Sequence, residues 1–109
     1  MRNKVESYMG FAAKARKIVN GYNTCSFMIE KKKVKLLILA KDLGENSRKK
    51  MVSVANRYGV PVKTYGTIDQ LSHITGTVGI GIFAITDEEF SKIISEEIDN
   101  IQSLEKEVF

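Results

Sequence analysis

The segment VKLLILA at residues 34–40 decides the fold of this chain. Six of its seven residues are apolar, whereas a strand with one solvent-facing side alternates apolar and polar residues. A nearly continuous apolar run of this length is typical of a strand that is buried on both faces. We therefore expect residues 34–40 in the middle of a sheet that helices cover on both sides.

Helix-like and strand-like segments alternate on both sides of this strand. Apolar residues at helical spacing predict helices over residues 4–16, 23–33, 47–58, 67–76 and 86–98. Short apolar runs predict the remaining strands over residues 17–21, 60–65 and 78–86. This order predicts a single domain over residues 1–109, an α/β fold built as a three-layer α/β/α sandwich with a mixed sheet of about four strands.

Residues that can cap helices stand near four of the expected helix starts. They are Asn23, Asn46 or Ser47, Thr67, and Thr86 or Asp87. At Asn23, residue type and position favour capping the helix over binding a ligand. The last helix should turn an apolar stripe toward the sheet, consisting of Phe90, Ile93, Ile94, Ile98 and Ile101.

Charge is divided unevenly along the chain. Residues 1–63 hold fifteen Lys or Arg and four Asp or Glu, while residues 64–109 hold two Lys and nine acids. A basic half of this kind attracts a polyanion, and the acidic half limits unspecific association. The same lysines could equally do no more than solvate helix surfaces, and the charge pattern alone leaves both interpretations open.

The sequence offers little for catalysis, for a cofactor or for a metal. His73 and Cys25 are each the only residue of their type, so they provide no metal cluster and no catalytic group of several residues. The glycines of GTVGIG, residues 76–81, end a helix and lead into a strand, which is the reverse of a dinucleotide-binding loop. We therefore expect no enzyme, no cofactor and no metal.

Membrane attachment and export are not expected either. No stretch approaches the roughly 20 apolar residues that a membrane-spanning helix needs, and residues 1–10 lack the apolar core of an export signal. We therefore expect a cytoplasmic monomer without a membrane partner.

Three segments of the sequence resemble a known family. They are GFAAKARKIVNG at residues 10–21, VKLLILAKD at 34–42, and the pair NSRKKM and YGVPV at 46–51 and 58–62. Together they make roughly residues 8–95 similar to the YlxQ-type bacterial members of the kink-turn-binding ribosomal-protein superfamily, also called the L7Ae/L30e superfamily. The resemblance implies the same sandwich and a structured RNA as partner, sharply bent and carrying tandem sheared G·A pairs.

The resemblance also implies which residues contact RNA. Gly21 and Asn23 match the start of the helix that enters the opened groove, whereas Thr24 replaces the usual Glu and Phe27 replaces a Lys. The loop that covers a flipped-out nucleotide corresponds to Ile74, Thr75, Gly76, Thr77 and Val78. Cations that could replace the lost positive charge are Lys14, Lys17 and Lys31.

Two functions remain open from the sequence. The first is binding of structured RNA, either a kink-turn or ribosomal RNA, with the ribosome as a further partner. The second is a ribosome-associated adaptor that contacts proteins and has lost specific kink-turn binding, an alternative that Thr24 and Phe27 favour.

Overall fold

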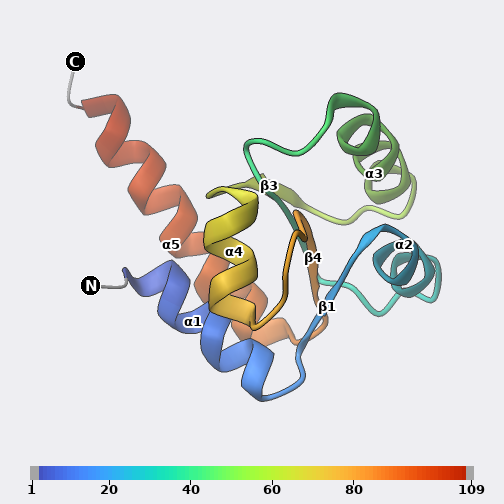
Figure 1. Ribbon diagram of the computed structural model, residues 1–109, viewed down its shortest axis with the longest axis horizontal. Coiled ribbons are helices and arrows are strands. Elements are labelled where there is room, and N and C mark those ends of the chain that lie inside the picture. Colours follow the sequence, from blue (N-terminus) through green and yellow to red (C-terminus); the bar gives the residue numbers. More distant parts are fainter. Residues whose placement is uncertain (1–2, 108–109) are drawn as a thin grey trace.

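Helices and strands alternate along the chain in the computed structural model, which describes residues 3–107 (Figure 1). Residues 1–2 and 108–109 of the predicted domain lie outside this range. The elements are α1 (Lys4–Lys14), β1 (Ile18–Asn20), α2 (Tyr22–Glu30), β2 (Leu36–Leu39), α3 (Glu45–Arg57), β3 (Val62–Thr64), α4 (Ile68–Thr75), β4 (Ile82–Ile85) and α5 (Glu88–Glu107).

The four strands form one sheet in the order β1-β4-β2-β3. Strand β4 pairs antiparallel with both β1 and β2, while β2 pairs parallel with β3. The sheet is therefore mixed, as predicted. All four residues of β2 are buried and the strand lies inside the sheet, which confirms the prediction of a central strand that is buried on both faces.

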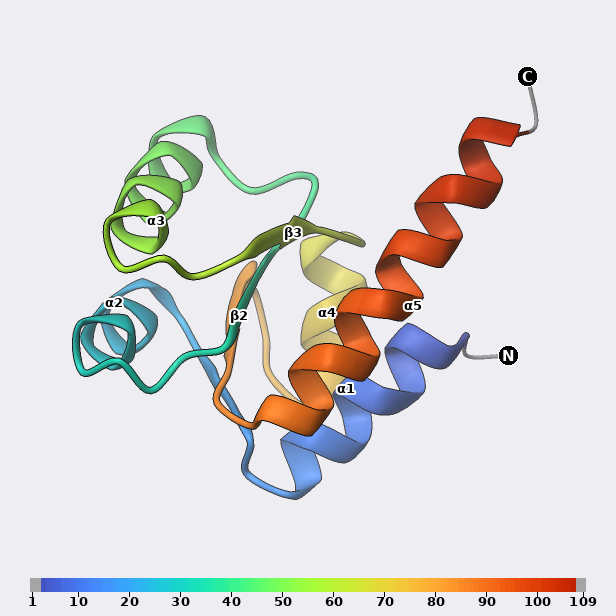
Figure 2. The ribbon, with the colours of Figure 1, turned by 180° about the vertical axis from the view of Figure 1, so that it is seen from behind.

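Helices cover both faces of this sheet, so the three-layer sandwich is confirmed (Figure 2). Leu36 and Ile38 of β2 belong to a core shared with α1, α4 and α5. Leu37 and Leu39 belong to a separate core shared with α2 and α3. Successive residues of a strand point to opposite faces, which is why neighbours in one apolar run serve two different cores.

Two of the predicted helix starts are wrong. Helix α2 begins at Tyr22 after Gly21 and α3 begins at Glu45 after Gly44, and neither start has a side-chain cap. Asn23 therefore does not cap α2, and neither Asn46 nor Ser47 caps α3. The turn at Gly21 explains the first difference, because its φ of 87° suits glycine and lets the chain enter the helix immediately after β1.

Two other helix starts are as predicted. Thr67 accepts a hydrogen bond from the Gln70 N–H, and the Gln70 side chain accepts one from the Thr67 N–H, which completes a capping box at α4. Of the two candidates at α5, Asp87 carries the contact, since its Oδ2 accepts from the Phe90 N–H at 2.9 Å. Gly76 ends α4 in the left-handed conformation.

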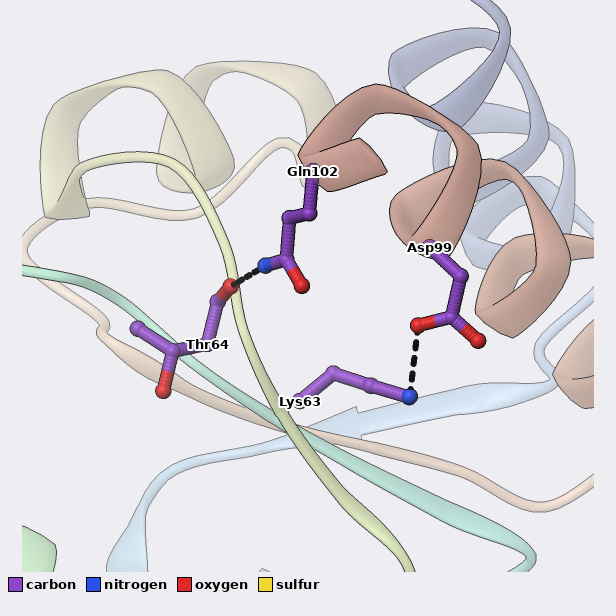
Figure 3. A network of polar contacts seen from close by, with 4 residues as sticks. All are labelled: Lys63, Thr64, Asp99 and Gln102. Carbon is purple, nitrogen blue, oxygen red and sulfur yellow. Dashed lines mark hydrogen bonds and ion pairs between the residues drawn. The ribbon is translucent and has the colours of Figure 1, made fainter. Parts of the chain in front are cut away.

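The predicted stripe on α5 needs one correction. Ile94 and Ile98 are fully buried, but Ile93 is 37% exposed. The helix also runs past residue 98, and two polar contacts link it to β3 (Figure 3). They are the Lys63–Asp99 ion pair at 2.6 Å and the bond from Gln102 Nε2 to the Thr64 carbonyl oxygen at 3.1 Å.

Candidate nucleic-acid interface

Four chain segments meet at one edge of the sheet, which we call the carboxyl edge because β1, β2 and β3 end there. The Gly21 N–H donates to the Ile82 carbonyl oxygen (3.0 Å), joining the start of α2 to the start of β4. The Ala40 N–H donates to the Gly81 carbonyl oxygen (2.9 Å), joining the end of β2 to the α4–β4 loop. The sheet thus brings the start of α2 next to the end of that loop, which includes part of the predicted RNA-binding loop.

The start of α2 is open to a ligand. Gly21 offers no side-chain acceptor, and the first N–H groups of a helix have no partner inside the helix. Tyr22, Asn23 and Thr24 carry these groups and are all exposed. Such a helix start favours anions, since its N–H groups point outward and its dipole is positive there.

Asn23 lies in the first turn of α2, and its amide is not used to cap the helix. The side chain is exposed. An amide can both donate and accept, which suits the mixed donors and acceptors of a base edge. The geometry at this residue is therefore compatible with recognition of a nucleic-acid base.

The α4–β4 loop presents an apolar tip on a fixed base. The Ser72 hydroxyl bonds both the N–H and the carbonyl oxygen of Ile80, each at 2.9 Å, and the Thr77 N–H bonds the Ser72 carbonyl oxygen at 2.8 Å. Val78 lies between these anchors and is 92% exposed. The prediction that 78–86 forms a strand is wrong before Ile82, because the Ser72 contacts hold Ile80 beside α4.

Ile74, Thr75 and Gly76 lie beside a groove between α1 and α4 rather than at the loop tip. Lys14 lines the same groove, as do Phe11 and His73, and its volume is about 350 Å³. The structure therefore brings Lys14 together with this first part of the predicted loop.

Lys17 and Lys31 lie away from Asn23. The Lys17 carbonyl oxygen accepts from the Thr86 N–H (2.9 Å), and Thr86 follows the last residue of β4 at the opposite edge of the sheet. Lys31 follows the last residue of α2, a full helix length from Asn23. Either lysine could contact only a part of an RNA that extends beyond the carboxyl edge.

Lys41 is a cation at the carboxyl edge that the sequence reasoning did not include among the site residues. It follows β2, is exposed, and its N–H donates to the Gly66 carbonyl oxygen (2.8 Å). The signal was its place directly after a buried strand, where ligands of open α/β sheets gather. Arg48, in contrast, is occupied within the protein, since its guanidinium bonds the Ala40 carbonyl oxygen and the Thr64 hydroxyl.

Neither Cys25 nor a group of metal-ligating side chains forms a second site within residues 3–107. Cys25 is fully buried, and burial raises the pKa of its thiol to about 12, so it is a neutral core residue. Within residues 3–107, no three His, Cys, Asp or Glu side chains are placed to hold a metal ion. No helix in that range is long and apolar enough to cross a membrane.

The fold and this edge define a small α/β/α domain that presents a free helix start, an exposed loop tip and a cation side by side. A family model described as the ribosomal protein L7Ae/L30e/S12e/Gadd45 family matches residues 3–95. The chain belongs to this family, and the resemblance seen in the sequence is confirmed.

Two relatives agree with this assignment. The chain is 33% identical to the RNA-binding protein YlxQ of Bacillus subtilis over 88 residues, 80% of this chain and 88% of that protein. It is 28% identical to the RNA-binding protein YlxQ of Enterococcus faecium over 98 residues, 90% of this chain and 94% of that protein.

Two solved structures have the same fold. A protein with unknown function from Bacillus halodurans superposes with a TM-score of 0.87 at 28% identity, covering 90% of this chain and 99% of that one. The Giardia lamblia 15.5kD RNA binding protein superposes with a TM-score of 0.74, covering 95% of this chain and 92% of that one. At 16% identity the second likeness establishes the fold alone.

Proposed function

We propose that this protein binds structured RNA of the kink-turn type, without catalysing a reaction and without a cofactor. Membership of the L7Ae/L30e/S12e/Gadd45 family and the two relatives named as RNA-binding proteins support this function. The observation that carries it is the exposed Asn23 on an uncapped helix start beside the α4–β4 loop.

The parts of the carboxyl edge would contact different groups of the RNA. The Asn23 amide would bond a guanine edge, while the free N–H groups of Tyr22 and Thr24 and the ammonium of Lys41 would bind phosphates. Val78 would cover a base that has left the stack, because unpaired bases are the part of RNA that proteins read by contact. Kink-turn RNA offers these groups together, and ribosomal RNA is a source of such bends.

Thr24 weakens this recognition compared with an acidic residue at the same place. Its hydroxyl can accept hydrogen bonds, but it lacks the charge that strengthens a bond from guanine N–H groups. A good bidentate base contact is worth about 1–3 kcal/mol by analogy with DNA. We expect a preference for kink-turn RNA that is real but weaker than that of a site with Glu.

Asn23→Ala tests the proposal. The variant should lose about tenfold or more in affinity for a kink-turn RNA, because one or two base contacts disappear. Calorimetric or gel-shift titration at one stated salt concentration measures this, with an unbent duplex of equal length as the reference RNA.

Asn46→Ala is the matched control. Asn46 is also an exposed Asn in the first turn of a helix that starts after an uncapped glycine. The Asn46→Ala substitution should leave the affinity for the kink-turn RNA unchanged. Equal binding of wild type to the kink-turn and to the duplex would contradict the proposed function, and equal binding by wild type and Asn23→Ala would remove Asn23 from it.

A protein-contacting adaptor on the ribosome is the second candidate. The observation in its favour is Phe27, which is 56% exposed on α2. Exposed aromatic residues often anchor protein interfaces. This candidate gains support if purified protein has no preference for the kink-turn over the duplex.

A further inference from the structure

We propose that Phe27 and Lys31 hold one unpaired nucleotide of the RNA that is bound at Asn23, with its base on the Phe27 ring and its phosphate at the Lys31 ammonium. This inference rests on the proposed function and names a further feature of the target. The RNA would carry an unstacked nucleotide along the outer face of α2, beyond the bases that the carboxyl edge reads.

The three residues form one row on α2 and its C-cap. Asn23, Phe27 and Lys31 are each four positions apart, and residues at that spacing lie above one another on a helix. With a rise of about 1.5 Å per residue, each step of the row is about 6 Å. An RNA strand that leaves Asn23 along the helix therefore meets an aromatic ring first and a cation second.

Phe27 is available for stacking. The residue is 56% exposed, although a side chain as large and apolar as that of phenylalanine is normally buried in a core. The Lys31 Nζ lies 5.3 Å from the ring centroid, a distance at which the positive charge is attracted to the ring face. The ammonium thus covers one face of the ring, so a base would stack on the other face and bring its phosphate to the same lysine.

The neighbours of Phe27 favour a nucleotide over a protein partner. The positions three and four residues away on the helix are Asn23, Thr24, Glu30 and Lys31, all polar and exposed. Protein interfaces instead surround an aromatic anchor with packed residues and exclude charges from the centre. An isolated ring with cations nearby is the arrangement that binds single-stranded nucleic acid.

The cations continue past the end of the helix. Lys32 and Lys33 follow Lys31, and both are exposed. The row therefore leads from a helix start that favours anions to a cluster of three lysines. A polyanion matches this charge at both ends, whereas an acidic protein segment would leave the aromatic ring without a stacking partner.

The experiment combines changes in the protein with changes in the RNA. A kink-turn RNA is prepared with an abasic site at each unpaired position in turn, and a parallel set carries the fluorescent base 2-aminopurine. Wild type, Phe27→Leu and Lys31→Gln are titrated with both sets at one salt concentration. Tyr58→Leu serves as the control, since Tyr58 is also an exposed aromatic residue (37%) but follows the last residue of α3 and is not among the proposed contacts.

The expected result is one RNA position that is coupled to Phe27. Phe27→Leu should lower affinity for the intact RNA about 5- to 150-fold, the range that stacking of one base accounts for. An abasic site at that position should weaken wild type equally but leave Phe27→Leu unaffected. 2-Aminopurine there should be quenched by wild type and not by Phe27→Leu, and Lys31→Gln should flatten the salt dependence.

Several outcomes would overturn the inference. One is Phe27→Leu binding every RNA as wild type does, and another is an equal loss with Tyr58→Leu. If Asn23→Ala still loses affinity in these cases, the proposed function stands and only the stacking site fails. If wild type shows no preference for the kink-turn over a duplex, both fail, and Phe27 is free to anchor a protein partner.

Discussion

The two helix layers of this protein both pack apolar side chains against the sheet, but they differ in how their helices begin. In the layer of α1, α4 and α5, side chains cap the helix starts, namely Asn3, Thr67 and Asp87. In the layer of α2 and α3, both starts follow a glycine that offers no cap. A capping side chain accepts hydrogen bonds from the first N–H groups of a helix and so stabilises it. Where the cap is absent, these N–H groups stay free for a partner.

Charge follows the same division. Helix α5 spans seven acids and two lysines in sequence. Three lysines follow α2, and α3 holds four Lys or Arg and one Glu. Polyanions are therefore attracted to the layer with free helix starts and repelled from α5, so charge and free N–H groups favour the same side of the sheet.

Cavities in the two cores test whether the layers are equally well packed. Ile29→Ala on α2 and Ile98→Ala on α5 each remove a fully buried side chain. Both should lower the free energy of unfolding by about 2–5 kcal/mol. Urea unfolding followed by circular dichroism measures this, and a loss below about 1 kcal/mol for Ile29→Ala alone would mean that the α2 layer is only loosely held.

Alkaline pH tests the buried side of α2. The pKa of Cys25 is raised from 9.0 to about 12, so above pH 9 the unfolded chain releases a proton that the folded chain keeps. The stability linked to Cys25 is thus fully present below pH 9 and is lost as pH rises toward 12, by roughly 1 kcal/mol at pH 10.

Cys25→Ala separates this effect from other groups that titrate at high pH. The variant should start less stable, because a buried group is lost, but its stability should fall less steeply between pH 8 and pH 10. Parallel slopes for the two proteins would show that the thiol is not held in the packed environment seen here.

Removing a cap tests the stabilising layer. Thr67→Ala disrupts the capping box at α4 and should lower the free energy of unfolding by about 1 kcal/mol. Affinity for kink-turn RNA should stay as in wild type, because Thr67 is not part of the proposed contacts. A loss of RNA affinity at a temperature where the variant is still fully folded would contradict the division between the layers.

Much of this fold could be predicted because apolar runs and helical spacing report burial directly. The apolar run at residues 34–40 predicted the buried strand. Thr67 and Gly76 predicted the start and the end of α4. Signals of this kind are local, since each depends on a few neighbouring side chains.

The starts of α2 and α3 could not be predicted in the same way. A glycine before a helix has no side chain that marks the start. The prediction therefore placed the helix starts at Asn23 and Asn46, although both helices begin one residue earlier. The run from residue 78 to 86 looked like a strand throughout because nothing local indicates that Ser72 holds Ile80.

The candidate site was predicted in part. Asn23 and Val78 are both exposed, and the sheet hydrogen bonds bring the start of α2 to the end of the α4–β4 loop. Lys17 and Lys31 are close to this corner in sequence but lie toward the opposite edge of the sheet. Lys41 is remote in sequence, yet strand pairing places it at the same edge, a relation that only the topology reveals.

The most direct test of the account is an NMR titration of the isotope-labelled protein with a kink-turn RNA, following each backbone amide. We expect the largest shifts at Tyr22, Asn23 and Thr24 and in the loop around Val78, with those of α5 unchanged. Shifts centred on α5, or none at the start of α2 while RNA binds, would contradict the claim that the uncapped start of α2 is the RNA site.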